Sequence, residues 1–314
     1  MSKSKVPPFS PDDTLAESGQ ALLRHYARVL LPTQKTSEVS ETSDVYEPVL
    51  STKRIKSMRV ATRRMRGVLR LFEPYFKRKV NKALYKPLRE LAGLTGRTRD
   101  WHLMIEAAEA HVLRCDDDGK QAIQPMIDYW RAEHKQAVIA LETYCQSNAF
   151  AKWQAQINAL LTADPSSIAR AWEVGEPLRL RHVLEAWLWQ HIADVRAYDE
   201  LPDHPTPEQV HALRIAIKNL RYLLDALQSL MPTRQAAWAA RLHRQCVLAQ
   251  DAYGLLNDAH THETYINAFV EGARQRGLRI PLQGIRVYAT EQHRLVEEQT
   301  VKWRSYLTSL IKTQ

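Results

Sequence analysis

Residues 55–66 read IKSMRVATRRMR, and this segment predicts a helix with two chemically different faces. Apolar or small residues recur at intervals of three or four, which places them on one side of a helix. They are Ile55, Met58, Thr62, Met65, Leu69 and Phe72. Basic residues recur in the same way and form a neighbouring stripe. They are Lys56, Arg59, Arg63, Arg66 and Arg70. The predicted helix therefore presents a cationic edge beside a core face.

A second segment repeats this pattern. Residues 210–221 read VHALRIAIKNLR, and ten of the twelve positions are identical or chemically similar to the first segment. The second cationic stripe consists of His211, Arg214, Lys218 and Arg221. Further along the chain, GRTRD at residues 96–100 corresponds to GLLND at residues 254–258. Because the order of both elements is preserved, the sequence predicts the duplication of a helical unit.

The remainder of the chain also predicts helices. Only 10 of its 314 residues are Gly, which disfavours folds that are rich in tight turns, so we expect an all-α protein. The expected division is a disordered tail at 1–12, a first helical half at 13–163, a linker at 164–178 and a second helical half at 179–314. The expected helices lie near 15–31, 52–76, 78–92, 99–114, 120–147, 148–162, 183–198, 207–230, 234–275 and 281–312. We also expect a helix break near Gly254 and a mobile polar linker at 32–50.

Charge is distributed unevenly along the chain. The net charge is +9, yet residues 51–100 alone carry 16 basic and 3 acidic residues, a local charge of +13. Only Glu73 is acidic between residues 51 and 89, so ion pairs along the helix cannot neutralise the first stripe. A solvated basic face would explain one such stripe. Its recurrence in a second segment favours a bound polyanion, such as nucleic acid, an anionic membrane surface or a phosphate polymer.

The two segments resemble the signatures of the CHAD family, the conserved histidine α-helical domain. Both copies are similar to the pattern V-H-x-[ML]-R-V-x-x-[RK]-R-[LM]-R followed by L-G-x-x-[RN]-D, and the resemblance extends from about residue 13 to the end. It implies two four-helix bundles related by pseudo-twofold symmetry, with the two basic helices facing each other across a central channel or groove. It also implies inorganic polyphosphate as the ligand and association with polyphosphate granules. Because the chain has no E-x-E-x-K motif of the associated triphosphatase domain, we expect a stand-alone member.

The resemblance further implies which residues bind polyphosphate. From the first motif they are Arg59, Arg63, Arg64, Arg66 and Arg70, and from the second they are His211, Arg214, Lys218, Arg221 and Tyr222. Arg99 and Asp100 match the later motif in one copy, and Asn257 and Asp258 match it in the other; of these four, only Arg99 is expected to bind polyphosphate. Basic residues nearby, among them Arg89 and Arg97, either extend this site or belong to the general surface.

Several positions depart from the family pattern. Lys56 stands where the first histidine is expected, which argues against a symmetric pair of histidines but keeps the positive charge, so we include it in the site. Asn219 replaces a basic residue, and Asp225 stands where Arg70 would repeat. Thr95 and Tyr253 replace the leucine of the later motif.

Two other functions fit parts of the sequence. A nucleic-acid-binding protein could use the basic stripes with the eight Trp and twelve Tyr residues, although most of these aromatics have the spacing of core residues. A metal-dependent phosphohydrolase could use the clusters Asp258, His260, His262 and Glu263, or His102, Glu106 and His111. Their spacings suit chelation poorly, and no known nucleophile or P-loop motif is present. We therefore expect a polyphosphate-binding protein without catalytic activity, metal or cofactor.

The cellular setting is also predicted. Cys115, Cys145 and Cys246 are odd in number and widely separated, which argues against a disulfide framework and favours a reducing compartment. The sequence shows no signal peptide and no uninterrupted apolar stretch long enough to span a membrane. We expect a cytoplasmic protein that has no membrane partner and that can form a homodimer.

Overall fold

The computed structural model describes residues 10–31, 50–170, 178–199, 206–227, 230–231, 233–278 and 281–312. Throughout these residues the regular structure is helical, which confirms the predicted all-α class. The predicted tail at 1–12 and the predicted linker at 32–50 lie almost entirely outside the described residues. Among the helices that are described, none is both long and apolar enough to cross a membrane.

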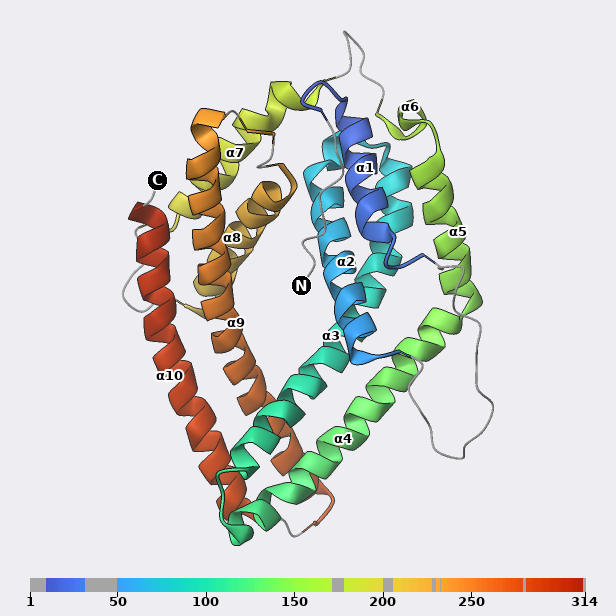
Figure 1. The fold of residues 1–314 in the computed structure, drawn as a ribbon. Coiled ribbons are helices and arrows are strands. Elements are labelled where there is room, and N and C mark those ends of the chain that lie inside the picture. The colour runs from blue at the N-terminus through green and yellow to red at the C-terminus, as the bar shows by residue number, and fades with distance from the viewer. Residues whose placement is uncertain are drawn as a thin grey trace. The chain divides into compact units, whose positions relative to one another are not determined.

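The helices follow one another along the chain as Figure 1 labels them. The first group is α1 (Leu15–Ala27), α2 (Thr52–Leu71), the 3-10 turn η1 (Glu73–Tyr75), α3 (Arg78–Val112), α4 (Asp117–Gln146), α5 (Asn148–Thr162) and α6 (Pro165–Ile168). The second group is α7 (Leu180–Arg196), α8 (Pro207–Leu227), α9 (Thr233–Gln275) and α10 (Leu282–Lys312).

Local capping fixes where the first helices begin. At the start of α1, the Thr14 side chain accepts a hydrogen bond from the Glu17 backbone N–H, and the Glu17 carboxylate accepts one from the Thr14 N–H at 2.7 Å. This reciprocal arrangement satisfies two backbone donors that the helix itself cannot. At the start of α2, the Ser51 hydroxyl accepts a hydrogen bond from the Arg54 N–H at 3.2 Å. The sequence of the basic helix therefore contains its own start signal.

Two of the predicted helix breaks are wrong. Helix α3 continues through the expected gap between residues 92 and 99, and α9 continues through Gly254. A glycine within a helix costs only about 1 kcal/mol relative to alanine, and buried neighbours keep each helix packed at this point. On α9 they are Ala252 and Tyr253, directly before Gly254, and on α3 buried residues stand on both sides of Gly93. On α3 these include Leu91 and Thr95. The GRTRD and GLLND segments consequently lie within long helices.

Packing divides the chain into two compact units. Unit 1 contains residues 1–99 and 135–185, and unit 2 contains residues 100–134 and 186–314. This division cuts across the sequential halves suggested by the repeat, because the long helices α3 and α4 each contribute one part to each unit. Helix α2 belongs to unit 1 and helix α8 belongs to unit 2.

The core of unit 1 forms where α1 lies alongside α2 (Figure 1). Phe72 and Phe76 are fully buried, and their rings stack with centroids 6.1 Å apart. Gly19 of α1 lies directly against them, since a Cβ atom at this position would be 2.5 Å from Phe76 Cζ. The absence of a side chain at Gly19 therefore lets α1 cover the aromatic pair.

The core of unit 2 is built around α9 and α10, which run side by side in Figure 1. Ile285 and Tyr288 of α10 are fully buried. At its first turn, α10 approaches α4 so closely that a Cβ atom on Gly284 would lie 2.4 Å from Ala122 Cβ. Because Ala122 Cβ is fixed to its backbone, only a shift of the helices could relieve such a clash.

We expect the substitution Gly284→Ala to lower the free energy of unfolding by about 1–3 kcal/mol, the usual cost of overpacking. The matched control is Gly93→Ala in α3, where an added Cβ would meet nothing within 4 Å. This control should be neutral or stabilising by as much as about 1 kcal/mol, because alanine is the better helix former. Urea denaturation measures both variants, and equal effects would contradict the close approach of α10 and α4.

Candidate functional site

Helix α2 separates its apolar and basic residues as the sequence predicted. Ile55, Met58 and Met65 are buried, with at most 6% of their surface exposed. The cations of the α2 stripe are exposed or half-buried: Lys56, Arg59, Arg63 and Arg70 are exposed, and Arg66 is half-buried. The buried face anchors the helix in unit 1 and leaves the stripe at the surface.

Part of the α2 stripe has no counterion among the residues that the structure describes. Among the residues that the structure describes, no carboxylate lies within 4.0 Å of the charged nitrogens of Lys56, Arg59 or Arg66. Arg66 Nε is buried and lacks a hydrogen-bond partner in this part of the chain. Like charges that recur at each helical turn destabilise a helix slightly, and an anion bound along the stripe would remove this cost.

Tyr85 of α3 supports the stripe, and the sequence analysis missed it. The guanidinium carbon of Arg66 lies 5.7 Å from the centroid of the Tyr85 ring. Hydrogen bonds and positive charge from Arg66, with a smaller contribution from Arg70, lower the pKa of Tyr85. The sequence could have indicated Tyr85, because this aromatic residue stands within a run of cations that contains Lys82, Lys86 and Arg89.

Arg64 lies apart from the α2 stripe, although the resemblance placed it in the same site. Its guanidinium carbon is 5.3 Å from the centroid of the Tyr26 ring on α1. There its charge contributes, after burial and Arg28, to lowering the pKa of His25. Arg64 therefore contacts the α1 side of the helix.

The other predicted cations of unit 1 lie on α3. Arg89 and Arg97 are exposed, and Arg99 is half-buried. Arg89 follows Tyr85 by about one helical turn on α3. At a rise of 1.5 Å per residue, Arg97 and Arg99 lie about 20 Å farther along the helix than Tyr85. They are therefore distant from Tyr85 along the same helix.

Helix α8 repeats the two-faced pattern. Leu213, Ile217 and Leu220 are buried with at most 1% of their surface exposed. Of the predicted binding residues, His211 is exposed, whereas the others are half-buried: Arg214, Lys218, Arg221 and Tyr222. The guanidinium carbon of Arg214 lies 4.8 Å from the Tyr253 ring centroid, so a tyrosine of the following helix also supports this stripe.

The second stripe differs from the first because it contains a carboxylate. Asp225, at the position that corresponds to Arg70, lies 3.8 Å from Arg221 Nε and 2.7 Å from His243 Nε2. Arg221 also donates a hydrogen bond of 2.6 Å to the Gln250 side chain. Cys246 lies close to the same pair, and burial raises the pKa of its thiol to about 12. The positive charge of the α8 stripe is therefore partly neutralised within unit 2.

The two stripes lie on different units, the α2 stripe on unit 1 and the α8 stripe on unit 2. Their arrangement across a shared channel or groove remains a prediction. In the later motifs, Asp100 and Asp258 are half-buried, and the Asn257 side chain lies outside the described residues.

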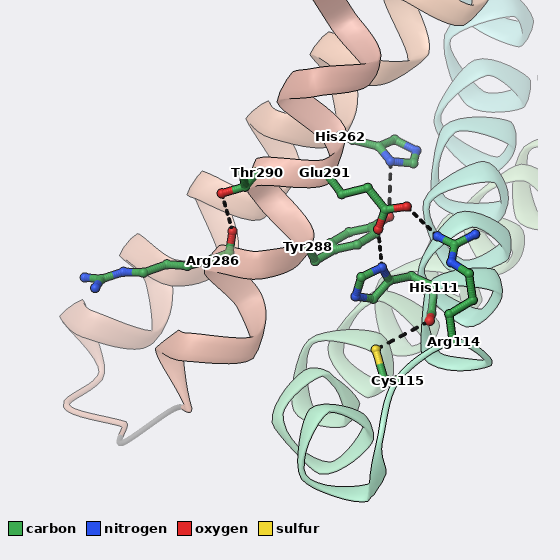
Figure 2. A network of polar contacts seen from close by, with 8 residues as sticks. All are labelled: His111, Arg114, Cys115, His262, Arg286, Tyr288, Thr290 and Glu291. Carbon is green, nitrogen blue, oxygen red and sulfur yellow. Dashed lines mark hydrogen bonds and ion pairs between the residues drawn. The ribbon is translucent and has the colours of Figure 1, made fainter.

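The histidine clusters considered for a phosphohydrolase make other contacts. His262 is buried, and its Nδ1 lies 3.2 Å from the Tyr288 hydroxyl, while His111 Nδ1 pairs with the Glu291 carboxylate (Figure 2). His260 lies among the side chains that are not described. Within the described ranges, no group of three or more His, Cys, Asp or Glu residues is arranged to hold a metal ion.

The fold and the two basic helices define an all-helical protein with a duplicated cationic motif. The family model of the CHAD domain matches residues 43–266. The chain therefore belongs to the CHAD family, as its two motifs indicated.

Solved structures share this fold. One is the CHAD domain from the plant Ricinus communis, with a TM-score of 0.65 and 15% sequence identity, covering 97% of this chain and 95% of that chain. Another is PptA from Streptomyces chartreusis, with a TM-score of 0.68 and 17% identity, covering 95% of this chain and all of that chain. At these identities the similarity concerns the fold alone. No curated protein matches the sequence significantly.

Proposed function

We propose that this protein binds inorganic polyphosphate through its basic helices, with the α2 stripe as the main contact and the α8 stripe as a weaker one. The observation that carries the proposal is the exposed α2 stripe, in which Lys56 and Arg59 have no carboxylate partner among the described residues. Membership of the CHAD family and the recurrence of the stripe on α8 support the same ligand.

The chemistry of the stripe suits a linear phosphate polymer. Each internal phosphate carries about one negative charge and only oxygen acceptors, so recognition depends on charge and hydrogen bonding. Arg can donate two parallel hydrogen bonds to one phosphate, and Lys supplies a point charge. Successive cations of the α2 stripe are separated along the helix axis by about 5 Å, at a rise of 1.5 Å per residue. Consecutive cations can therefore contact successive parts of an extended chain.

In this proposal the protein acts by binding alone, without catalysis, a metal or a cofactor. Polyphosphate granules are the proposed location of the complex. A homodimer is compatible with this function but is not needed for it, because each chain carries both stripes.

A binding isotherm with polyphosphate of defined length tests the proposal. We expect saturable binding whose affinity falls as salt rises, since each phosphate contact releases counterions. The complex should persist when excess double-stranded DNA or RNA is added at physiological salt. Displacement by nucleic acid would favour the nucleic-acid function instead, and shortening of the polymer in the presence of Mg²⁺ would show that the protein is an enzyme.

Asp225 provides a second test that concerns the α8 stripe. We expect Asp225→Asn to tighten polyphosphate binding by roughly three- to tenfold, because Arg221 loses its carboxylate partner. The same change should lower the stability of the protein, since it leaves a partly buried guanidinium without its counterion. Isotherms and urea denaturation measure the two effects.

The control for this test is Asp128→Asn on α4, which changes the net charge equally. Asp128 pairs with Arg131 at 3.2 Å, outside either stripe. The substitution Asp128→Asn should leave the affinity for polyphosphate nearly unchanged. If both variants tighten binding to the same extent, the effect comes from net charge and the α8 stripe takes no specific part.

A further inference from the structure

Tyr85 of α3 lies beside the last two cations of the α2 stripe. The guanidinium carbon of Arg66 is 5.7 Å from the centroid of its ring. Arg66 and, less strongly, Arg70 also direct N–H donors toward its hydroxyl oxygen, and together they lower the pKa of Tyr85. The Tyr85 side chain is half-buried, so part of its surface remains open to a ligand. On α3 itself, Lys82 and Arg89 stand about one helical turn before and after Tyr85, and both are exposed.

A contact of this kind recurs in the second copy of the repeat. The offset of 158 residues that relates GRTRD to GLLND also relates Tyr85 to His243. His243 Nε2 lies 2.7 Å from a carboxylate oxygen of Asp225, which is the counterpart of Arg70. In both copies, therefore, one position of the following helix meets the last position of the stripe. The contact belongs to the duplicated unit and not to a chance neighbour of α2.

The two copies differ in what this contact leaves for a ligand. In the second copy, the Asp225 carboxylate supplies an anion to both His243 and Arg221. In the first copy, Arg66 has no carboxylate within 4.0 Å of its charged nitrogens in the described part of unit 1 or unit 2. An external anion can therefore take, beside Tyr85, the part that Asp225 takes beside His243.

The Tyr85 hydroxyl also has a hydrogen-bond donor to offer. A phenolic hydroxyl can accept hydrogen bonds from guanidinium groups and still donate its own hydrogen atom. Within the described ranges, no acceptor receives this hydrogen. Phosphate oxygens are strong acceptors, and a hydrogen bond from a hydroxyl to a charged oxygen is short and stronger than one between neutral groups. A phosphate beside Arg66 could accept hydrogen bonds from both side chains.

We propose that the Tyr85 hydroxyl binds polyphosphate directly, donating its hydrogen to a phosphate oxygen that Arg66 also contacts. This contact, which rests on the proposed function, adds a neutral donor to the cations of the stripe. Only the protonated phenol can donate, so binding should weaken as the pH rises through the pKa of Tyr85, which lies below its ordinary value of 10. A bound polymer should raise this pKa, because its negative charge disfavours the phenolate.

The substitution Tyr85→Phe tests the proposal, because it keeps the ring beside Arg66 and removes only the hydroxyl. Isotherms with polyphosphate of defined length at neutral pH should show an affinity weakened by about three- to tenfold. The dependence of affinity on salt should keep its slope, because no cation is lost. The matched control is Tyr129→Phe on α4, where Arg276 also lies 5.7 Å from the ring centroid but outside either stripe. This control should leave the affinity unchanged.

The ultraviolet absorbance of ionised tyrosine gives a readout that a merely structural role of Tyr85 would not move. The difference between pH titrations of the wild type and of Tyr85→Phe isolates this residue among the twelve tyrosines. Saturating polyphosphate should shift its ionisation to higher pH. By the same linkage, the affinity of the wild type should fall more steeply than that of Tyr85→Phe as the pH is raised from neutral to alkaline values.

The possible results separate Tyr85 from the proposed function. Equal or tighter binding by Tyr85→Phe would overturn the role of Tyr85, and so would an ionisation of Tyr85 that polyphosphate does not shift. Equal losses in Tyr85→Phe and Tyr129→Phe would also overturn it, since the effect would not be specific to the stripe. All three results leave the proposed function intact, because the isotherm of the wild type tests that function. If the wild type binds no polyphosphate, both proposals fail.

Discussion

Replacing Arg59, Arg63 and Arg66 together with Gln should weaken polyphosphate binding by at least about a hundredfold. Each arginine that hydrogen bonds to a phosphate contributes more than a neutral hydrogen bond, and three adjacent losses affect one continuous surface. The dependence of affinity on salt should also become shallower, by about two units in the logarithmic slope, because fewer counterions are released. The measurement is a set of isotherms at several salt concentrations.

The stability of this triple variant separates a binding site from a structural one. Arg59 and Arg63 are exposed, and removing like charges from one helix face relieves repulsion. The free energy of unfolding should therefore change by no more than about 1 kcal/mol, because relief of this repulsion offsets the lost contact between Arg66 and the Tyr85 ring. A control that replaces Lys152, Arg170 and Arg286 with Gln removes the same charge from other parts of the surface. If this control loses as much affinity as the triple variant, the α2 stripe is only a solvated basic face.

Acidification should destabilise the protein through His262. Burial lowers the pKa of His262 from its ordinary 6.5 to about 4. Between these two values the unfolded chain binds a proton that the folded protein does not bind. Stability is therefore fully present above pH 6.5 and is lost as the pH falls toward 4. The shift corresponds to about 3 kcal/mol at the acid end.

The contacts of His262 explain the direction of this effect. Its Nδ1 lies 3.2 Å from the Tyr288 hydroxyl, and its side chain also hydrogen bonds to Gln292, which offsets part of the shift. Urea denaturation at several pH values, compared with His262→Gln, isolates its contribution. The variant should lose less stability than the wild type between pH 6.5 and 4. If the free energies of unfolding of the wild type and of His262→Gln fall equally with pH, His262 is not the group whose protonation weakens unit 2.

The faces of α2 and α8 could be predicted because helical periodicity is a local property. The spacing of Ile55, Met58 and Met65 places them on one side whatever the helix packs against, and the structure buries all three. The partners of the cations could not be predicted in this way. Tyr85 supports Arg66 from the following helix, and Arg64 contacts Tyr26 on the preceding one. Such contacts depend on how helices cross, which the spacing within one helix does not encode.

By itself, the sequence determined the helical class, the two duplicated basic motifs and the family to which the chain belongs. Tertiary structure alone decided that α3 and α9 remain continuous through their glycines. It also decided that α3 and α4 each contribute one part to unit 1 and another part to unit 2. It also decided that Asp225 contacts His243, which partly neutralises the second stripe. The physical reason is the same in each case. Burial against residues distant in sequence outweighs a local preference of about 1 kcal/mol, and it brings together charges that no spacing rule relates.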